Sequence, residues 1–413
     1  MELQSALHKL GIQTMRPFQS DLLEKLQNGQ DIICLAPTSA GKSLVFQTFA
    51  LTSEKLVIVI EPHLALELDQ VAKLQKHGIP AACINGLMPV SERKTVIDKI
   101  KSKELWLLYL TPEMLQNEEL QQIFRNIDIV GIMVDEAHAI SKQGAGFRED
   151  YLKIGSFMDT LPCRPVVGAF TATATRATEK DITEKLHLQC PYRHCAGVTR
   201  DNIELSVTEI GNGLGGRKDA DVIEQRKREK ICRCLNKQRN GRIVIYCNTI
   251  SRVENLYEYL QDKGYSVEFY HGKCDHKPDR LRAFTQGDVK IMVATNAFGL
   301  GVDIPDIRLI IHHSPLIGLD DYVQEVGRAG RDGKKSKALL LWHEYDFTIN
   351  ERLIRESQMQ LTGRELKNRL DALKALHTYA KNEQDCRWQL IREFFGEDKG
   401  KRCKKRCDNC RFK

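Results

Sequence analysis

The sequence predicts an α/β protein with two tandem parallel-sheet domains, followed by a small helical segment that is rich in cysteine. Short β-branched and aliphatic runs alternate with helical stretches, which is typical of parallel sheets covered by helices on both faces. The alternation is interrupted after residue 200 and then restarts, so the chain contains two such units. Beyond about residue 345 the apolar spacing becomes helical and leads to a basic, cysteine-rich end. The expected domains are therefore 1–200, 201–345 and 346–413.

Nine apolar runs are the expected strands. Those of the first sheet are residues 31–35, 56–60, 105–110, 129–134 and 166–170. Those of the second are residues 242–247, 267–270, 290–294 and 309–312. Between the two sets, residues 211–230 are Gly-rich and charged without apolar periodicity, which predicts a linker or surface excursion.

Charge and composition restrict the class of protein. The chain has 413 residues and a net charge of +7, and residues 399–413, with eight basic side chains and one aspartate, supply all of this excess. A body of balanced charge excludes a uniformly basic packaging protein. A chain that is 42% hydrophobic and 28% charged is also typical of a folded protein. The first fifteen residues lack the apolar core of a signal peptide, so we expect a soluble, unexported protein, cytoplasmic or (in a eukaryote) nuclear.

The first motif predicts a phosphate site. Residues 36–43 read Ala-Pro-Thr-Ser-Ala-Gly-Lys-Ser, which matches the P-loop pattern G-x-x-x-x-G-K-[ST] except that Ala36 replaces the first glycine. Backbone N–H groups of such a loop face phosphate oxygens, its lysine reaches the β- and γ-phosphates, and its serine helps to hold Mg²⁺. The expected contacts are Thr38, Ser39, Ala40, Gly41, Lys42 and Ser43. A helix start that binds nothing is the alternative.

Two adjacent acids follow the apolar run 129–134. Asp135 and Glu136 emerge where open α/β sheets bind ligands, at the carboxyl end of a strand. We expect Asp135 to bind Mg²⁺ and Glu136 to polarise the attacking water. An ordinary solvated strand end is the alternative, and the P-loop makes it the weaker one.

A third motif lies in the second unit, where residues 324–333 read Gln-Glu-Val-Gly-Arg-Ala-Gly-Arg-Asp-Gly. We expect Arg328 and Arg331 on one face of a short helix, from which both can reach across a cleft. Their guanidinium groups can stabilise the charge that develops on a transferring phosphoryl group. Gln324 completes the expected catalytic set. Because these residues come from another domain, hydrolysis should depend on domain closure.

Four of the thirteen cysteines lie near the C-terminus: Cys386, Cys403, Cys407 and Cys410. One cysteine on a helix and three on a turn can surround a tetrahedral zinc ion as thiolates. Closed four-ligand sites are structural, so no zinc chemistry is expected. A set of surface thiols is the alternative.

Together these residues resemble a superfamily 2 helicase, and most closely the RecQ family of ATP-dependent DNA helicases. The resemblance covers nearly the whole chain and implies two RecA-like domains and a zinc-binding subdomain. It implies ATP and Mg²⁺ at the first site and structural zinc at the cysteines. It also implies 3′–5′ movement on single-stranded DNA, unwinding of tailed duplexes, a role in DNA repair or recombination, and single-strand-binding or other repair proteins as partners. No membrane partner is implied.

The resemblance also assigns roles to individual residues. Residues 10–19 are similar to the family's adenine-recognition element, which makes Arg16 and Gln19 nucleotide contacts, although Ile12 replaces the usual aromatic. Gly301 and Asp303 match residues of the closed ATP cleft. The residues implied to contact the DNA strand are Pro62, Thr111, Phe147, Arg148 and Thr295. Residues 171–174 resemble the motif that couples the ATP site to nucleic acid.

Two departures from the family pattern leave alternatives open. In the family's aromatic-rich loop, which senses single-stranded DNA, Gln143, Ala145 and Gly146 differ from the usual residues, so coupling between DNA and ATP is expected to be weaker. No winged helix follows the cysteines, so duplex separation is expected to be weak or to depend on the zinc module and a partner. The alternatives are an RNA helicase, for which Asp-Glu-Ala-His at 135–138 is equally suitable, and a DNA-binding or annealing protein.

Overall fold

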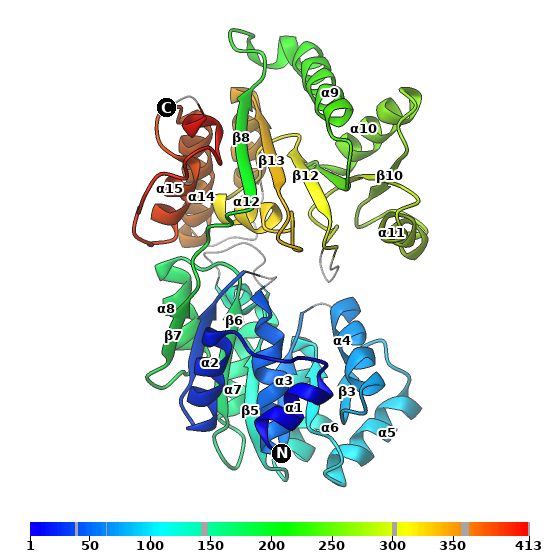
Figure 1. The fold of residues 1–413 in the computed structure, drawn as a ribbon, viewed down its shortest axis with the longest axis vertical. Coiled ribbons are helices and arrows are strands. Elements are labelled where there is room, and N and C mark those ends of the chain that lie inside the picture. Colours follow the sequence, from blue (N-terminus) through cyan, green and yellow to red (C-terminus); the bar gives the residue numbers. More distant parts are fainter. Residues whose placement is uncertain (38–39, 63, 142–147, 300–303, 357–362, 412–413) are drawn as a thin grey trace. The chain divides into compact units, whose positions relative to one another are not determined.

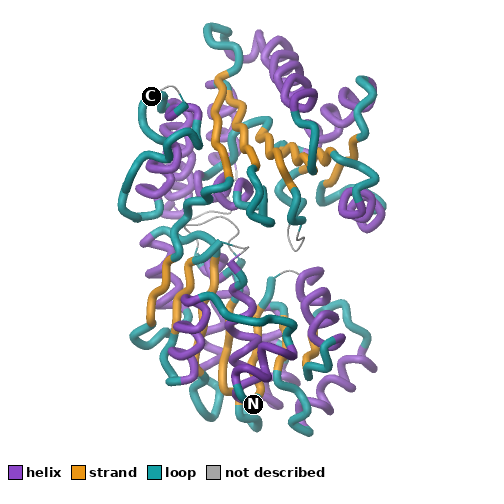
Figure 2. The backbone as a smooth tube through the Cα atoms, viewed as in Figure 1, coloured by secondary structure: helices purple, strands orange, loops and turns teal. Residues whose placement is uncertain are grey.

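The structure is a computed structural model, and it describes residues 1–37, 40–62, 64–141, 148–299, 304–356 and 363–411. The chain divides into two compact units, Met1–Gly197 and Val198–Lys413. Each unit contains one parallel sheet with helices on its faces (Figures 1 and 2). The predicted fold class, two tandem parallel α/β sheets and a helical C-terminal region, is confirmed. No helix within the described ranges is long and apolar enough to cross a membrane.

The sheet of the first unit has the strand order β3-β4-β2-β5-β6-β1-β7. Its strands are β1 (Ile32–Leu35), β2 (Leu56–Ile60), β3 (Ala81–Ile84), β4 (Leu107–Leu110), β5 (Ile129–Val134), β6 (Val166–Thr171) and β7 (Tyr192–Cys195). The five predicted strands are all present, whereas β3 and β7 were not predicted.

Helices cover both faces of this sheet. They are α1 (Leu3–Lys9), α2 (Pro17–Gln27), α3 (Lys42–Ser53), α4 (Leu64–Lys76), α5 (Val90–Lys101), α6 (Glu118–Phe124), α7 (Lys153–Met158) and α8 (Arg176–Lys185), with short 3₁₀ turns η2 (Pro112–Gln116), η3 (Ala137–Ile140) and η4 (Glu149–Leu152). Because side chains alternate along a strand, Val57 and Val59 of β2 enter the core beneath α3, while Ile58 and Ile60 enter the opposite core. This two-sided burial explains why the central strands are continuous apolar runs.

The sheet of the second unit has the order β10-β11-β9-β12-β13-β8. Its strands are β8 (Ile203–Glu209), β9 (Arg242–Tyr246), β10 (Val267–Tyr270), β11 (Ile291–Ala294), β12 (Ile307–His312) and β13 (Ser336–Trp342). Its helices are α9 (Ala220–Lys237), α10 (Ile250–Asp262), α11 (Lys277–Gln286), α12 (Leu319–Val326), α13 (Glu344–Glu356), α14 (Gly363–Lys381) and α15 (Arg387–Phe394), with 3₁₀ turns η5 (Gly216–Asp219) and η7 (Asp408–Cys410).

The prediction of a linker at residues 211–230 was wrong from residue 220 onward, because α9 begins there. Its buried positions recur every four residues at Ile223, Lys227, Ile231 and Leu235. Lys227 occupies an apolar position of this stripe, and its charge is balanced by Asp346 at 2.7 Å, with side chains 1% and 4% exposed. The buried ion pair therefore concealed the helical period in the sequence.

The cysteine-rich end is built into the second unit. Leu205 of the outermost strand β8 forms a parallel bridge to Cys407, and the Leu205 amide donates to the Arg406 carbonyl oxygen at 3.1 Å. Asp408 accepts hydrogen bonds from the Val207 amide at 2.7 Å and from Arg387 Nε at 3.0 Å. The segment thus lies against β8, as Figure 1 also shows.

Candidate functional site

The predicted phosphate loop joins β1 to α3. Gly41 has a φ of 78°, in the left-handed region that favours glycine, and a Cβ there would lie 2.7 Å from Gln19 Nε2. Lys42 opens α3, is 5% exposed, and its Nζ donates to the Ala36 carbonyl oxygen at 3.0 Å. Ser43 is half-buried in the same first turn, and Ala40 is buried. Thr38 and Ser39 lie outside the described residues.

Arg16 and Gln19, predicted to contact the nucleotide, both bind the loop itself. Gln19 Nε2 donates to the carbonyl oxygens of Ala40 at 3.2 Å and Gly41 at 2.8 Å. Arg16 Nη1 also donates to the Ala40 oxygen, at 3.1 Å, while the Arg16 amide donates to Gln19 Oε1 at 2.8 Å. The start of α2 therefore holds the loop backbone next to Lys42. The role of these two residues in binding the base stays a prediction.

Asp135 lies directly beyond β5 and is 8% exposed. Its amide donates to the Ile60 carbonyl oxygen at 3.0 Å, and its Oδ1 accepts from the Glu136 amide at 2.9 Å. Burial raises the pKa of Asp135 to about 6; the positive charge of Lys42 opposes this rise, and the negative charge of Glu136 adds to it. The structure therefore brings the P-loop lysine and the two strand-end acids into one electrostatic site.

A chain of polar contacts connects this site to the end of β6. Glu136 Oε2 lies 3.3 Å from His138 Nδ1, and the same nitrogen lies 2.9 Å from Thr171 Oγ1. On the other side, the Tyr151 hydroxyl, on a fully buried ring, donates to the Asp135 carbonyl oxygen at 3.0 Å. The sequence did not reveal the contacts of Tyr151 and His138, because they join residues 16 and 33 positions apart that no motif spacing relates.

Three of the predicted DNA contacts lie in the described part of the first unit. Arg148 Nη1 donates to the Pro62 carbonyl oxygen at 2.9 Å, so these two are brought together. Thr111 precedes η2 and is 5% exposed, and its hydroxyl has no hydrogen-bond partner within the described ranges. Phe147 lies outside the described residues.

In the second unit, the prediction that both arginines lie on a short helix was wrong. Gln324 lies on α12, but that helix ends at Val326, and Arg328 and Arg331 lie in the turns that follow. Gly330 has a φ of 54°, which helical backbone does not adopt. Arg328 Nη1 donates to the carbonyl oxygen of Gly299.

The predicted DNA contact of the second unit lies directly beyond the end of β11. Thr295 follows this strand, is 9% exposed, and its amide donates to the Tyr270 carbonyl oxygen at 3.1 Å. Gly301 and Asp303 lie outside the described residues.

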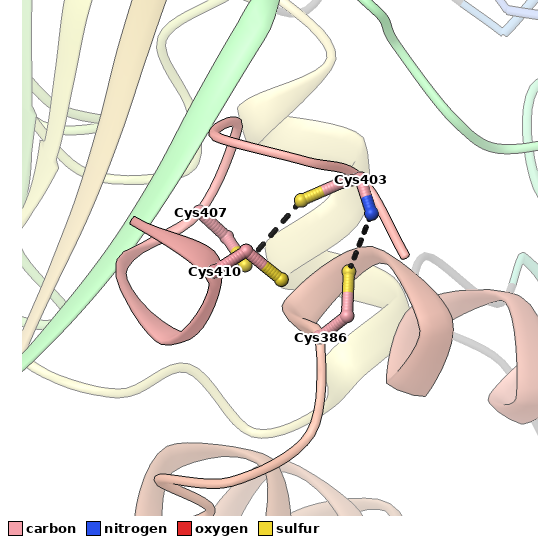
Figure 3. Close-up of side chains that lie close together, drawn as sticks. All are labelled: Cys386, Cys403, Cys407 and Cys410. Atoms are coloured by element: carbon pink, nitrogen blue, oxygen red, sulfur yellow. Dashed lines mark hydrogen bonds between the residues drawn. The ribbon is translucent and has the colours of Figure 1, made fainter. Parts of the chain in front are cut away.

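The four C-terminal cysteines converge (Figure 3). Their sulfur atoms all lie within 4.8 Å of one another, and all four residues are buried. Cys386 precedes α15, and its sulfur accepts from the Cys403 amide at 3.2 Å, while the sulfurs of Cys403 and Cys407 are 3.4 Å apart. A hydrogen bond from Cys407 lowers the pKa of Cys386 to about 4. Four buried sulfur ligands that converge in this way fit tetrahedral zinc.

Comparison with protein families defines the class. Residues 16–182 match the family "DEAD/DEAH box helicase", and residues 226–333 match "Helicase conserved C-terminal domain". Residues 344–411 match "RecQ zinc-binding", which agrees with the convergence of the cysteines. The chain therefore has a helicase core with a four-cysteine zinc site.

Individual relatives narrow this class. The chain is 35% identical over 352 residues to the ATP-dependent DNA helicase RecQ of Synechocystis, covering 83% of this chain and 71% of that protein. It is 32% identical to the RecQ of Pasteurella multocida, covering 97% of this chain and 60% of that protein. The chain belongs to the RecQ family. It spans less than two thirds of the length of the Pasteurella relative.

The fold also matches solved structures. That of the S. cerevisiae protein Dbp5 bound to RNA and ADP BeF3 superimposes with a TM-score of 0.64 at 18% identity, covering 92% of this chain and 91% of that one. This likeness extends to the fold alone.

Proposed function

We propose that the protein is an ATP-dependent DNA helicase that moves 3′ to 5′ on single-stranded DNA and separates tailed duplexes. The observation that carries the proposal is the shared site of Lys42 and Asp135, in which the positive charge of a P-loop lysine acts on a buried strand-end carboxylate. Membership of the RecQ family supports DNA as the substrate and DNA repair or recombination as the setting.

The residues of the first unit divide the work of hydrolysis. Lys42 exchanges its bond to the Ala36 oxygen for the β- and γ-phosphates of ATP. Ser43 and Asp135 would hold Mg²⁺, which would neutralise charge on the phosphate oxygens. Glu136, whose carboxylate is oriented by His138, accepts the proton of the attacking water.

The second unit supplies the groups that complete hydrolysis. Arg328 and Arg331 stabilise the charge on the transferring phosphoryl group, Gln324 supports them, and Gly301 and Asp303 close the cleft. A pair of such fingers accelerates hydrolysis by on the order of a thousandfold or more. Hydrolysis then depends on closure of the two domains, which converts ATP turnover into movement.

Contacts around the ATP site support coupling to DNA. Arg148 binds the Pro62 carbonyl, and Tyr151, three residues further along, binds the backbone of Asp135. A DNA strand bound at Pro62 and Arg148 is therefore connected to Asp135 through the short segment from Arg148 to Tyr151. The contacts from Glu136 through His138 to Thr171 provide a second path.

Basic side chains of the zinc region (residues 386–411) are further candidates for contact with DNA phosphates. Residues 399–406 include six basic side chains, of which Lys399 pairs with Glu393 at 3.5 Å, Arg406 pairs with Asp201, and Arg402 donates to backbone oxygens. Lys401, Lys404 and Lys405 are exposed, and we propose them as the principal contacts with DNA phosphates.

The test combines two assays on the whole chain. ATP hydrolysis is measured without nucleic acid, with single-stranded DNA, and with RNA of the same sequence, and unwinding is measured on duplexes with a 3′ or a 5′ tail. Stimulation by DNA together with unwinding of the 3′-tailed duplex is expected. Stimulation by RNA alone would identify an RNA helicase, and tight DNA binding without stimulated hydrolysis would identify an annealing protein.

A further inference from the structure

Residues 198–207, here called the strap, begin the second unit and continue into β8. One side of the strap is bonded to the zinc region. The Val198 amide donates to Glu397 Oε1 at 3.0 Å, and the Ile203 carbonyl oxygen accepts from Trp388 Nε1 at 3.3 Å. Asp201 forms an ion pair with Arg406. These contacts, with those of Leu205 and Val207, fix the strap to a rigid neighbour.

The other side of the strap binds the turn that carries the two arginine fingers. Arg200 Nη1 donates to the Gly327 carbonyl oxygen at 3.1 Å, and Arg200 Nη2 donates to that of Gly330 at 3.0 Å. Asn202 Nδ2 donates to the same Gly330 oxygen at 2.7 Å and to the Lys334 oxygen at 3.0 Å. Two strap side chains therefore hold carbonyl groups on both sides of Arg328.

This contact is close and specific. Gly330 has a φ of 54°, and a Cβ there would lie 2.5 Å from Asn202 Nδ2, so a larger residue would displace the amide. Burial lowers the pKa of Arg200, and the like charge of Arg331 lowers it further, which locates Arg200 close to the second finger. The buried charge of Arg200 is compensated by its hydrogen bonds to the carbonyl oxygens of Gly327 and Gly330, which lie beyond the end of α12 at Val326.

We propose that Arg200 and Asn202 are positioning residues of the ATPase, which fix the turn from Gly327 to Gly330 and thereby aim Arg328 and Arg331. The proposal rests on the proposed function, because it requires the arginines to act as fingers. The zinc region provides the fixed support, and the strap transmits that support to the turn. Val198 directly follows the last residue of the first unit, so the segment that connects the two units also holds the fingers.

A positioning role predicts a particular kinetic defect. Misplacing a catalytic group by about 1 Å can cost about a hundredfold in rate. Arg200→Ala should therefore lower kcat for ATP about ten- to hundredfold. The KM for ATP should stay within about twofold, because Arg16, Gln19 and Lys42 belong to the other unit.

The variants are Arg200→Ala, Arg200→Lys and Asn202→Asp. Lysine keeps the charge without the planar fork, so its loss of kcat should be smaller than that of alanine. Aspartate keeps the size of Asn202 but replaces a donor by an acceptor that repels the Gly330 oxygen. Arg352→Ala is the matched control, because Arg352 is an exposed arginine of the same unit that pairs with Glu356 within α13, and its removal should leave kcat unchanged.

The measurements are DNA-stimulated kcat and KM, the affinity for a non-hydrolysable ATP analogue, and the thermal unfolding midpoint. Each strap variant is also combined with Arg328→Ala plus Arg331→Ala. If Arg200 acts through the fingers, its removal lowers kcat no further in that background.

Four results would contradict the positioning role or the function on which it rests. If the loss of kcat caused by Arg200→Ala multiplies with the loss caused by the double finger variant, the positioning role is wrong. It is also wrong if Arg200→Ala leaves kcat unchanged while the finger variants are impaired. A fall in the unfolding midpoint that accounts for the lost activity in both Arg200→Lys and Asn202→Asp also overturns it. Full activity in the double finger variant alone instead refutes the assignment of Arg328 and Arg331 in the proposed function.

Discussion

Glu67 should destabilise the protein increasingly as pH rises, and replacing it by glutamine should remove this effect. The side chain lies in the first turn of α4 and is 0% exposed. Neither carboxylate oxygen has a hydrogen-bond partner in the part of the chain that the structure describes. Burial raises the pKa of Glu67 from its ordinary 4.5 to about 8, and the nearby charge of Glu113 adds to the rise. The folded protein therefore holds this group neutral at pH 7.

The size of the effect follows from that difference in pKa. A carboxyl group whose pKa is higher in the folded state favours folding fully below pH 4.5, and this contribution is lost as pH rises to about 8. One pKa unit corresponds to about 1.4 kcal/mol, so ionising the buried group costs at most about 5 kcal/mol. Local rearrangement lowers this limit, and we expect Glu67→Gln to gain about 2–4 kcal/mol relative to the native chain between pH 5 and 9. For a unit of this size, at about 2–4 °C per kcal/mol, that is about 4–16 °C in Tm.

The assay is thermal unfolding of both proteins at several pH values, with hydrogen exchange of the α4 amides as a local measure. Glu92→Gln is the control, because Glu92 occupies the equivalent first turn of α5 but is exposed. The difference in Tm between Glu92→Gln and the native chain should not depend on pH above 6. If the difference in Tm between Glu67→Gln and the native chain stayed constant from pH 5 to 9, ionisation of the buried carboxyl group would not destabilise the fold, and the reasoning would be wrong.

Three further predictions concern the sites themselves. Lys42→Ala should abolish ATP hydrolysis with an unchanged circular dichroism spectrum, because the loop loses the cation that binds the phosphates; retained hydrolysis in pure protein would contradict the P-loop assignment. Purified protein should contain one zinc ion per chain by metal analysis, and Cys407→Ser should lose it; protein prepared with zinc present but containing none would contradict the four-cysteine site. Replacing Lys401, Lys404 and Lys405 by glutamine should reduce the slope of log Kd against the logarithm of the salt concentration by about one per lost phosphate contact. An unchanged slope would exclude this contact surface.

The sequence was sufficient to predict those strands whose residue pattern has a single physical explanation. β2 and β5 were predicted with their observed bounds because both faces of these central strands are buried, which requires an uninterrupted apolar run. β8 was missed because it lies at the edge of its sheet and alternates buried with partly exposed residues. Its polar positions then resemble those of a loop. α9 was missed because Lys227 occupies one of its buried positions.

The same limit applies to the candidate site. Lys42 and Asp135 were predicted because local chemistry alone requires a loop before a helix and an acid after a strand. The bonds from Arg200 to Gly327 and from Asn202 to Gly330 join residues 127 and 128 positions apart. No spacing within a motif reveals such a pair, since only the order of the strands brings β8 close to the end of α12.

The position of Cys407 next to β8 has a consequence for solubility. β8 is the outermost strand of its sheet, and an open edge exposes unpaired amide and carbonyl groups that can recruit a strand from another molecule. The bridge from Leu205 to Cys407 and the bond from the Val207 amide to Asp408 cover part of this edge. The zinc region therefore limits pairing of the β8 edge with a strand of another molecule. A chain that loses its metal should therefore associate more readily with other molecules through the uncovered part of β8.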